Sequence, residues 1–216
     1  MSGKKDKYYI LMADVISSSE YNAKKLGHDL MHLVENVNSN MQDATLSPYT
    51  VTLGDEFQGV TKTLTTGIET ILDFEKQLMA MVCGFKLRYV LHYGSIETEI
   101  NQDTSHGMLG EGLAKARKQL STKKRDRKRF MFSLDDEEIS LQLNRLFEIM
   151  DGITQRWKID DYSLILSMIQ FDSDSEVGEK HGKDRTQIYR RRKTLLINEY
   201  NLLKDFILAY ARSINL

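Results

Sequence analysis

The sequence is poor in the residues and segments that mark several classes of protein. Its single cysteine, Cys83, excludes an intramolecular disulfide and a cysteine-based zinc site. No apolar run approaches the ~20 residues that a membrane span needs. The basic start, MSGKKDK, is followed by a short apolar run that Asp14 interrupts, unlike a signal peptide. We therefore expect a cytoplasmic protein that does not cross a membrane.

Proline and net charge are also nearly absent. The one proline is at position 48, and no linker rich in glycine and serine is present, so a domain boundary must fall in a helical connection. The net charge of −1 excludes a chain that binds polyanions through its overall charge, although local patches remain able to do so. Hydrophobic residues make up 41% of the chain and charged residues 28%, which predicts a packed core.

The first 157 residues alternate between strand-like and helix-like patterns. Short apolar segments predict strands, and apolar residues at helical spacing, such as Leu26, Leu30 and Leu33, predict helices. The first helix is expected to open at 17–20, and a glycine-rich loop to enter another helix within 106–120. The expected strands cover 8–16, 49–53, 57–61, 85–96 and 129–134. The order is β-α-β-β-α-β with an added helix and strand, which predicts a ferredoxin-like α+β fold: an antiparallel sheet with helices on one face.

The character of the chain changes after Trp157. Four helices with tight joints are expected over 160–171, 175–181, 185–196 and 198–214. This change in composition predicts two domains, a palm-like domain over 1–157 and an all-helical domain over 158–216.

The stretch YTVTLGDEFQGV, residues 49–60, places two carboxylates, Asp55 and Glu56, at a hairpin turn. Asp14 lies near the end of the first strand, and this topology brings that strand beside the hairpin. Two close carboxylates repel each other, and Mg²⁺ removes that repulsion while binding substrate phosphates. We therefore interpret Asp14 and Asp55 as ligands of Mg²⁺ or Mn²⁺. The structural alternative is that Asp14 caps a helix and Asp55 serves the turn.

Several segments resemble known families. LMADVISSS, VTLGDEFQGV and LRYVLHYGSI resemble class III nucleotidyl cyclases over about residues 8–120. The GDEF stretch resembles the GGDEF signature of diguanylate cyclases, which share the palm-like core, with one glycine fewer. ADVISSS, LGDEFQGV and the stretch from Gly107 to Arg117 resemble the bacterial SatD family, and this resemblance spans most of the chain.

The cyclase resemblance implies roles for particular residues. Asp14 and Asp55 would hold the metal, and Arg117 would stabilise the transition state. Lys115 offers further charge, or is a solvated surface residue. Cyclases place an asparagine four residues before this arginine; no asparagine is found here, and Leu113 or Ala114 occupies that neighbourhood. A homodimer is implied as well, since class III cyclases complete their sites across a dimer. The backbone that opens the first helix would face nucleotide phosphates, through Val15, Ile16, Ser17 and Ser18.

The segment SEVGEKHGKDRTQIYRRRKTL, within residues 175–196, fits a helix-turn-helix. Gly178 would let two helices approach, Gly182 would allow the sharp turn, and Ile188 would pack between the helices. His181 and Arg191 depart from the apolar pattern of such motifs. Contacts with DNA phosphates and bases are predicted for Arg185, Gln187, Tyr189, Arg190, Arg192 and Lys193. A protein-binding role is the alternative for this unit.

Three hypotheses follow. The first is a regulatory protein that binds a nucleotide with Mg²⁺ and contacts DNA or a protein partner through its C-terminal helices. The second is an enzyme, a metal-dependent nucleotidyl cyclase or nucleotidyltransferase that acts on NTPs. The third is an interaction protein with a vestigial site. The missing asparagine and the basic C-terminal segment favour the first hypothesis.

Overall fold

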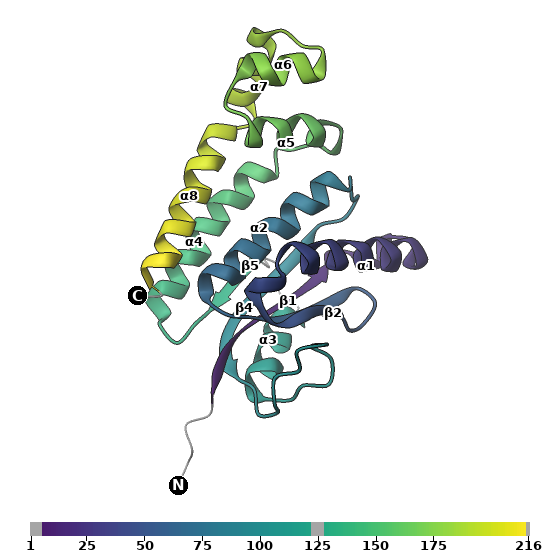
Figure 1. Cartoon of the computed structure of the whole chain (residues 1–216), viewed down its shortest axis with the longest axis vertical. Coiled ribbons are helices and arrows are strands. Elements are labelled where there is room, and N and C mark those ends of the chain that lie inside the picture. The colour runs from purple at the N-terminus through teal and green to yellow at the C-terminus, as the bar shows by residue number, and fades with distance from the viewer. Residues whose placement is uncertain (1–5, 122–127, 215–216) are drawn as a thin grey trace.

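The computed structural model describes residues 6–121 and 128–214, which form one five-stranded sheet and eight α-helices (Figure 1). The strands are β1 (Lys7–Val15), β2 (Thr45–Val51), β3 (Glu56–Thr61), β4 (Leu87–Ser95) and β5 (Phe130–Ser133). The helices are α1 (Ala23–Asn40), α2 (Leu64–Ala80), α3 (Glu111–Ser121), α4 (Glu137–Thr154), α5 (Tyr162–Gln170), α6 (Asp174–His181), α7 (Arg185–Thr194) and α8 (Ile197–Ile214). This composition confirms the predicted α+β class.

The strand order is β2-β3-β1-β4-β5. Strands β1 to β4 pair in antiparallel fashion, as expected for a β-α-β-β-α-β unit. The prediction of a wholly antiparallel sheet is wrong at one edge, because β5 runs parallel to β4. Helix α3 lies between these two strands in the chain, and such a crossover returns the chain in the same direction.

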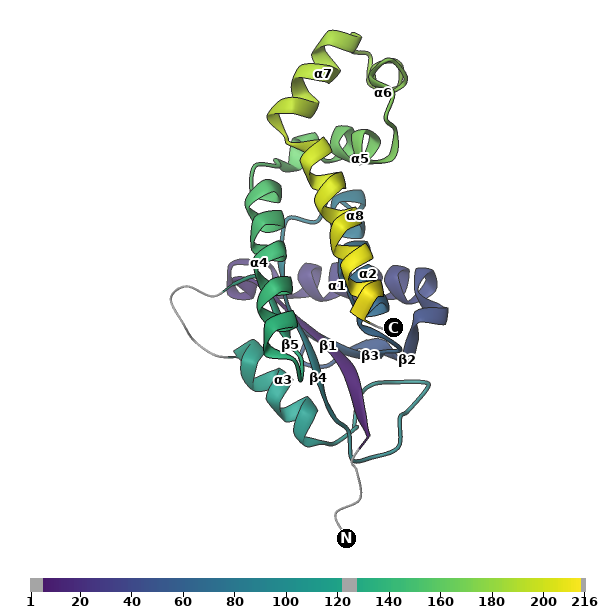
Figure 2. The ribbon, with the colours of Figure 1, turned by 90° about the vertical axis from the view of Figure 1, so that its left-hand side faces the viewer.

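Helices cover both faces of the sheet, which corrects the prediction of helices on one face. Helix α3 packs on one face through Leu113, Ala116 and Leu120, against the β1 residues Ile10 and Met12. The other face belongs to a larger cluster that includes residues of α1, α2, α4 and α8. Figures 1 and 2 show α3 on the side of the sheet away from α2 and α8. The nearly unbroken apolar sequence of β1 follows from this burial on both faces.

The C-terminal helices join the same core. The larger apolar cluster runs from Leu11 in β1 to Ala211 in α8, and α8 lies beside α4 (Figure 2). The indole Nε1 of Trp157 donates to the carbonyl oxygen of Leu195 at 2.9 Å. The division at residues 157 and 158 stays a prediction; in the structure one apolar cluster runs through both segments.

A buried charge network lies where β5 meets α2 and α4. The Arg129 guanidinium donates to the Leu87 carbonyl oxygen at 2.9 Å and to Asp151 Oδ1 at 3.2 Å, and it contacts Glu75. The Tyr89 hydroxyl donates to Glu75 Oε1 at 2.7 Å. One cation therefore holds a strand and two helices together.

We expect Arg129→Ala to lower the free energy of unfolding by about 3–5 kcal/mol, because the variant leaves two largely buried carboxylates without their cation. Urea denaturation followed by circular dichroism measures this. The matched control is Lys128→Ala, which removes an exposed pair with Glu148 and should change stability by about 1 kcal/mol or less. Equal losses in the two variants would contradict a stabilising role for the network.

Candidate functional site

A row of charged side chains crosses one end of the sheet. Asp14 on β1 pairs in register with Glu56 on β3 and with Arg88 on β4. Successive side chains of a strand point to opposite faces, and Ile10 and Met12 belong to the cluster under α3. Asp14 therefore projects on the α3 face, at the position where the apolar run of β1 stops.

Each acid of this row contacts an arginine. Arg88 Nη1 lies 2.9 Å from Asp14 Oδ2, and the two side chains are only 15% and 23% exposed. From α3, Arg117 Nε lies 3.1 Å from Glu56 Oε1, and its Nη2 donates to Gln58 Oε1 at 3.0 Å. Adjacent carboxylates repel each other, and a cation within ~4 Å of each offsets that repulsion. Asp14 and Glu56 thus lie side by side with their charges balanced.

Asp55 lies in the turn next to this row. Its carbonyl oxygen accepts a hydrogen bond from Val15 N at 2.9 Å, so the end of β1 and the turn are held together. Gly54, which precedes it, has a φ of 83°, a left-handed conformation that glycine adopts without steric penalty. Asp14 and the turn that contains Asp55 therefore lie next to each other at the same end of the sheet. Metal binding by these two carboxylates stays a prediction.

The close approach of α3 to β4 positions Arg117. A Cβ on Gly112 would lie 2.6 Å from the carbonyl carbon of Gly94, and one on Gly94 would lie 2.8 Å from Gly112 Cα. Only glycine at both positions lets helix and strand approach this closely. The site therefore depends on two glycines that contact neither acid.

The predicted phosphate-binding backbone is arranged differently from the expectation. Val15 is the last residue of β1, and its N–H already donates to Asp55, while Ile16 N donates to the Lys86 carbonyl at 2.9 Å. Ser17 is left-handed, with a φ of 55°, and Ser18 begins a single 3₁₀ turn, Ser18–Glu20. Helix α1 begins only at Ala23, where Asn22 caps it. The helix start expected at 17–20 is wrong. The backbone N–H groups of Val15 and Ile16 donate to backbone carbonyls in this structure, so neither faces a phosphate as the resemblance implied.

Lys115 lies on the exposed surface of α3, where its Nζ is 2.8 Å from Glu111 Oε1. His92, on β4, is buried, with Nδ1 2.9 Å from the Ser133 carbonyl oxygen. Burial lowers the pKa of His92, which favours the neutral ring.

Three residues of the site were not predicted: Glu56, Gln58 and Arg88. Glu56 stands beside Asp55 in the sequence, and the alternation of β3 places it on the same face as Gln58. This signal was readable from the strand pattern. Arg88 is found only from the register of β4 against β1.

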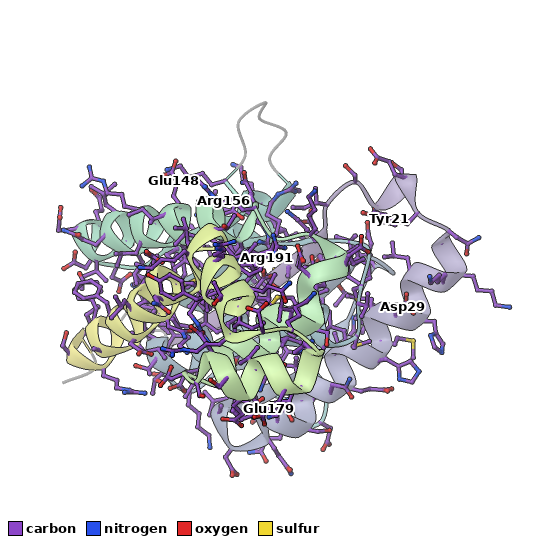
Figure 3. The ribbon with its side chains drawn as sticks, turned by 90° about the horizontal axis from the view of Figure 1, so that it is seen from above. Tyr21, Asp29, Glu148, Arg156, Glu179 and Arg191 are labelled. Carbon is purple, nitrogen blue, oxygen red and sulfur yellow. The ribbon has the colours of Figure 1, made fainter. Side chains whose placement is uncertain are left out.

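The basic C-terminal segment forms two short helices joined at Gly182. This glycine ends α6 with a φ of 61°, and a Cβ on Gly178 would lie 2.5 Å from the Lys183 carbonyl oxygen. Val177 and Ile188 are fully buried between the helices. The two residues that depart from the apolar pattern have polar partners. His181 Nε2 lies 2.9 Å from Ser167 Oγ. Arg191, which is labelled near the centre of Figure 3, pairs with Asp161 at 2.5 Å.

The residues expected to contact DNA are not all on the surface. Arg185, Gln187, Tyr189, Arg190 and Lys193 are exposed, and the Gln187 side chain also accepts from Asp184 N in the cap of α7.

Arg192 is a correction to the predicted DNA contacts, because only 6% of it is exposed. Its guanidinium donates to Asp174 Oδ1 at 2.8 Å and to the carbonyl oxygens of Met168 and Phe171 at 2.6 and 2.8 Å. These carbonyls end α5 and have no partner within their own helix, so Arg192 satisfies them and ties α7 to α5.

The described ranges, 6–121 and 128–214, contain no group of three or more histidine, cysteine, aspartate or glutamate residues arranged to hold a metal ion. Among the helices that the structure describes, none is long and apolar enough to span a bilayer.

The structure defines an α+β protein with a mixed sheet covered on both faces. The chain belongs to the SatD family, whose model matches residues 8–194. A comparison with curated protein sequences gives no match.

The solved structures to which this chain is similar include a bacterial light-regulated adenylyl cyclase. It is 15% identical, with a TM-score of 0.45 over 60% of this chain and 76% of that one. Another is the guanylate cyclase domain of RhGC from Catenaria anguillulae in complex with GTP, at 15% identity and a TM-score of 0.36 over 56% and 75%. Such scores carry no argument about activity, which must come from the residues of this chain.

We expect Arg192→Ala to lower the free energy of unfolding by about 3 kcal/mol, since it leaves a largely buried Asp174 and two helix-end carbonyls without a donor. Arg190→Ala, an exposed neighbour on the same helix, should change stability by about 0.5 kcal/mol or less. Urea denaturation of both variants measures the difference. Similar stabilities would show that Arg192 does not hold α7 in place.

Proposed function

We propose that this protein binds a nucleotide together with Mg²⁺ at the end of the sheet where Asp14 and Asp55 lie. We further propose that its C-terminal helices bind DNA or a protein partner and that the bound nucleotide regulates this binding. The observation that carries the proposal is the in-register row of Glu56, Asp14 and Arg88, beside the Asp55 turn and under Arg117. Acids and arginines interleaved at one edge suit a ligand that combines a cation with phosphates.

The donor set fits a magnesium–phosphate complex better than a bare cation. Mg²⁺ commonly uses one or two carboxylates and takes its remaining ligands from water and phosphate oxygens. Asp14 and Asp55 are the residues that would hold it, and Mn²⁺ is the alternative ion. Asp14 Oδ2 is already paired with Arg88, so a bare cation at this carboxylate would lie close to a guanidinium of like charge. A triphosphate brings negative charge that Arg88 and Arg117 are suited to accept. A bound ion would screen the charge of those phosphates.

The contacts of Arg117 favour binding over turnover. Its guanidinium is engaged by Glu56 and Gln58, and Leu113 occupies the position four residues before it. Catalysis requires groups aimed at the charge that develops in the transition state. A guanidinium that neutralises an acid of its own protein is less suited to that role. These features support a regulatory protein.

The second candidate function is a metal-dependent nucleotidyl cyclase or nucleotidyltransferase. The observation that favours it is the 47% exposure of the Arg117 side chain beside the acidic row, which leaves room for a phosphate to reach the guanidinium. Incubation with the four NTPs and Mg²⁺ or Mn²⁺, followed by separation of products, tests it. A homodimer stays an expectation based on the cyclase resemblance.

The surface of α7 supports the proposed DNA contact. Arg185, Arg190 and Lys193 are exposed, and the Tyr189 ring is 53% exposed with Lys193 Nζ 5.9 Å from its centre. Cations and an aromatic ring on a short helix suit contacts with phosphates and base edges. We propose that α6 and α7 act as a helix-turn-helix, with a protein partner as the alternative ligand.

We expect Mg²⁺ with ATP or GTP to raise the melting temperature by several degrees, since ligand at 100 times Kd stabilises the folded state by about 2.7 kcal/mol. Differential scanning fluorimetry measures the shift, each variant being compared with its own ligand-free state. Asp14→Asn and Asp55→Asn should abolish the shift, and the control Asp43→Asn, an exposed acid outside the site, should keep it. The nucleotide proposal fails if both site variants respond like the wild type.

The ligand-free Asp14→Asn variant should itself melt lower, because Arg88 loses a largely buried partner. If EDTA leaves the rise in melting temperature that the nucleotide causes in the wild type unchanged, the metal plays no part in binding.

For DNA, we expect affinity that falls steeply with salt, because cations on α7 would replace counterions on the phosphates. Filter binding to genomic and random duplexes, with and without Mg²⁺-nucleotide, measures this. Replacing Arg185 and Arg190 together by alanine should reduce the slope of log K against log salt by roughly two. The control replaces Lys24 and Lys62, exposed cations elsewhere, by alanine. Absence of salt-dependent binding under all these conditions would leave the protein partner as the ligand of α6 and α7.

A further inference from the structure

Helix α1 carries a pair of histidines that plays no part in the site described above. His28 and His32 are one turn apart, at i and i+4, and therefore lie on the same face of the helix. Their Nε2 atoms are 3.1 Å apart, and their side chains are 69% and 54% exposed. In Figure 3, Asp29, which is next to His28 in the sequence, lies at the right of the view, on the opposite side of the molecule from Glu148 of α4.

Each ring has a carboxylate at its other nitrogen. His28 Nδ1 lies 3.5 Å from Asp29 Oδ1, and His32 Nδ1 lies 3.4 Å from Glu35 Oε2. A carboxylate at Nδ1 favours the tautomer with its proton on Nδ1, and it leaves the lone pair on Nε2. In that tautomer, two lone pairs face each other across 3.1 Å, which is unfavourable unless a proton or a cation lies between them.

The separation of the two nitrogens suits a metal ion. Zinc–imidazole bonds are about 2.0–2.1 Å long, and two such bonds to nitrogens 3.1 Å apart close an angle of about 100° at the ion. That angle lies between the cis angle of an octahedron and the tetrahedral angle. No movement of the backbone is needed to reach it, because the spacing of one helical turn already sets it.

We propose that His28 and His32 form a two-imidazole site for a late first-row divalent cation, Cu²⁺, Ni²⁺ or Zn²⁺. Asp29 and Glu35 act as positioning residues that orient the rings. The other coordination positions are open to water or to an external ligand, because both histidines face solvent. Imidazole ligands select these ions, whereas carboxylates and phosphates select Mg²⁺. The site shares no residue with the Asp14 and Asp55 edge and does not rest on nucleotide binding.

Calorimetric titration of the full chain with Ni²⁺ and with Cu²⁺, in a non-coordinating buffer near neutral pH, tests the proposal. The two rings together should bind each ion at least tenfold more tightly than a single ring does. The wild type should bind Cu²⁺ more tightly than Ni²⁺. His28→Gln and His32→Gln should each lose that tenfold advantage. The matched control is His106→Gln, which removes an exposed histidine outside α1 and should bind like the wild type.

The proposal is wrong if either α1 variant keeps the affinity of the wild type, or if His106→Gln weakens binding as much as they do. Because His28 and His32 are exposed, the variants should fold, and circular dichroism checks this. Glu35→Gln should weaken Ni²⁺ binding by about tenfold or less while leaving both imidazoles in place, as an orienting carboxylate would. Asp14→Asn should leave Ni²⁺ affinity unchanged, which separates this site from the proposed nucleotide site.

Discussion

Strand β1 is held in one register between β3 and β4, and the candidate site depends on that register. On the α3 face, the strand presents Ile10, Met12 and then Asp14. A carboxylate therefore occupies the position at which the apolar row of side chains would otherwise continue. A carboxylate this close to an apolar layer is costly without a cation. Arg88 supplies that cation from the facing position of β4, and a slip of one residue would send Asp14 to the opposite face.

The same register fixes the other parts of the site. Glu56 stands opposite Asp14 and needs a cation of its own, which α3 supplies through Arg117. Arg117 reaches Glu56 because α3 lies close against β4, and the contact between Gly94 and Gly112 permits that approach. Four elements therefore frame the site, and β1, β3, β4 and α3 each carry one of its charged groups.

The sequence predicted the order of elements well, because periodicity separates helices from strands wherever one face is polar. It predicted that Asp14 and Asp55 come to one edge, because the topology leaves few alternatives. It did not predict helices on both faces, although β1 has no polar alternation and so carried that signal. The direction of β5 and the pairing of Arg88 depend on contacts between distant segments, which local patterns do not encode. Arg192 lies in a run of basic residues that the sequence alone does not distinguish from one another. Only the packing of α5 against α7 shows that its side chain points inward.

The two halves of the proposed function are joined by packed helices. Helix α2 packs beneath the sheet and contacts α5 and α8, and Arg129 binds β4, α2 and α4 together through Leu87, Glu75 and Asp151. A signal between sites requires an element with two arrangements that both ligands bias. The Asp14–Arg88 pair is suited to that role, because a cation at Asp14 and the Arg88 guanidinium compete for the same carboxylate. A metal–nucleotide complex would offer each partner a replacement, with the ion taking Asp14 and the phosphates taking Arg88. Arg88 follows directly after Leu87, whose carbonyl accepts from Arg129, so the site and the network that holds α2 and α4 meet on adjacent residues of β4.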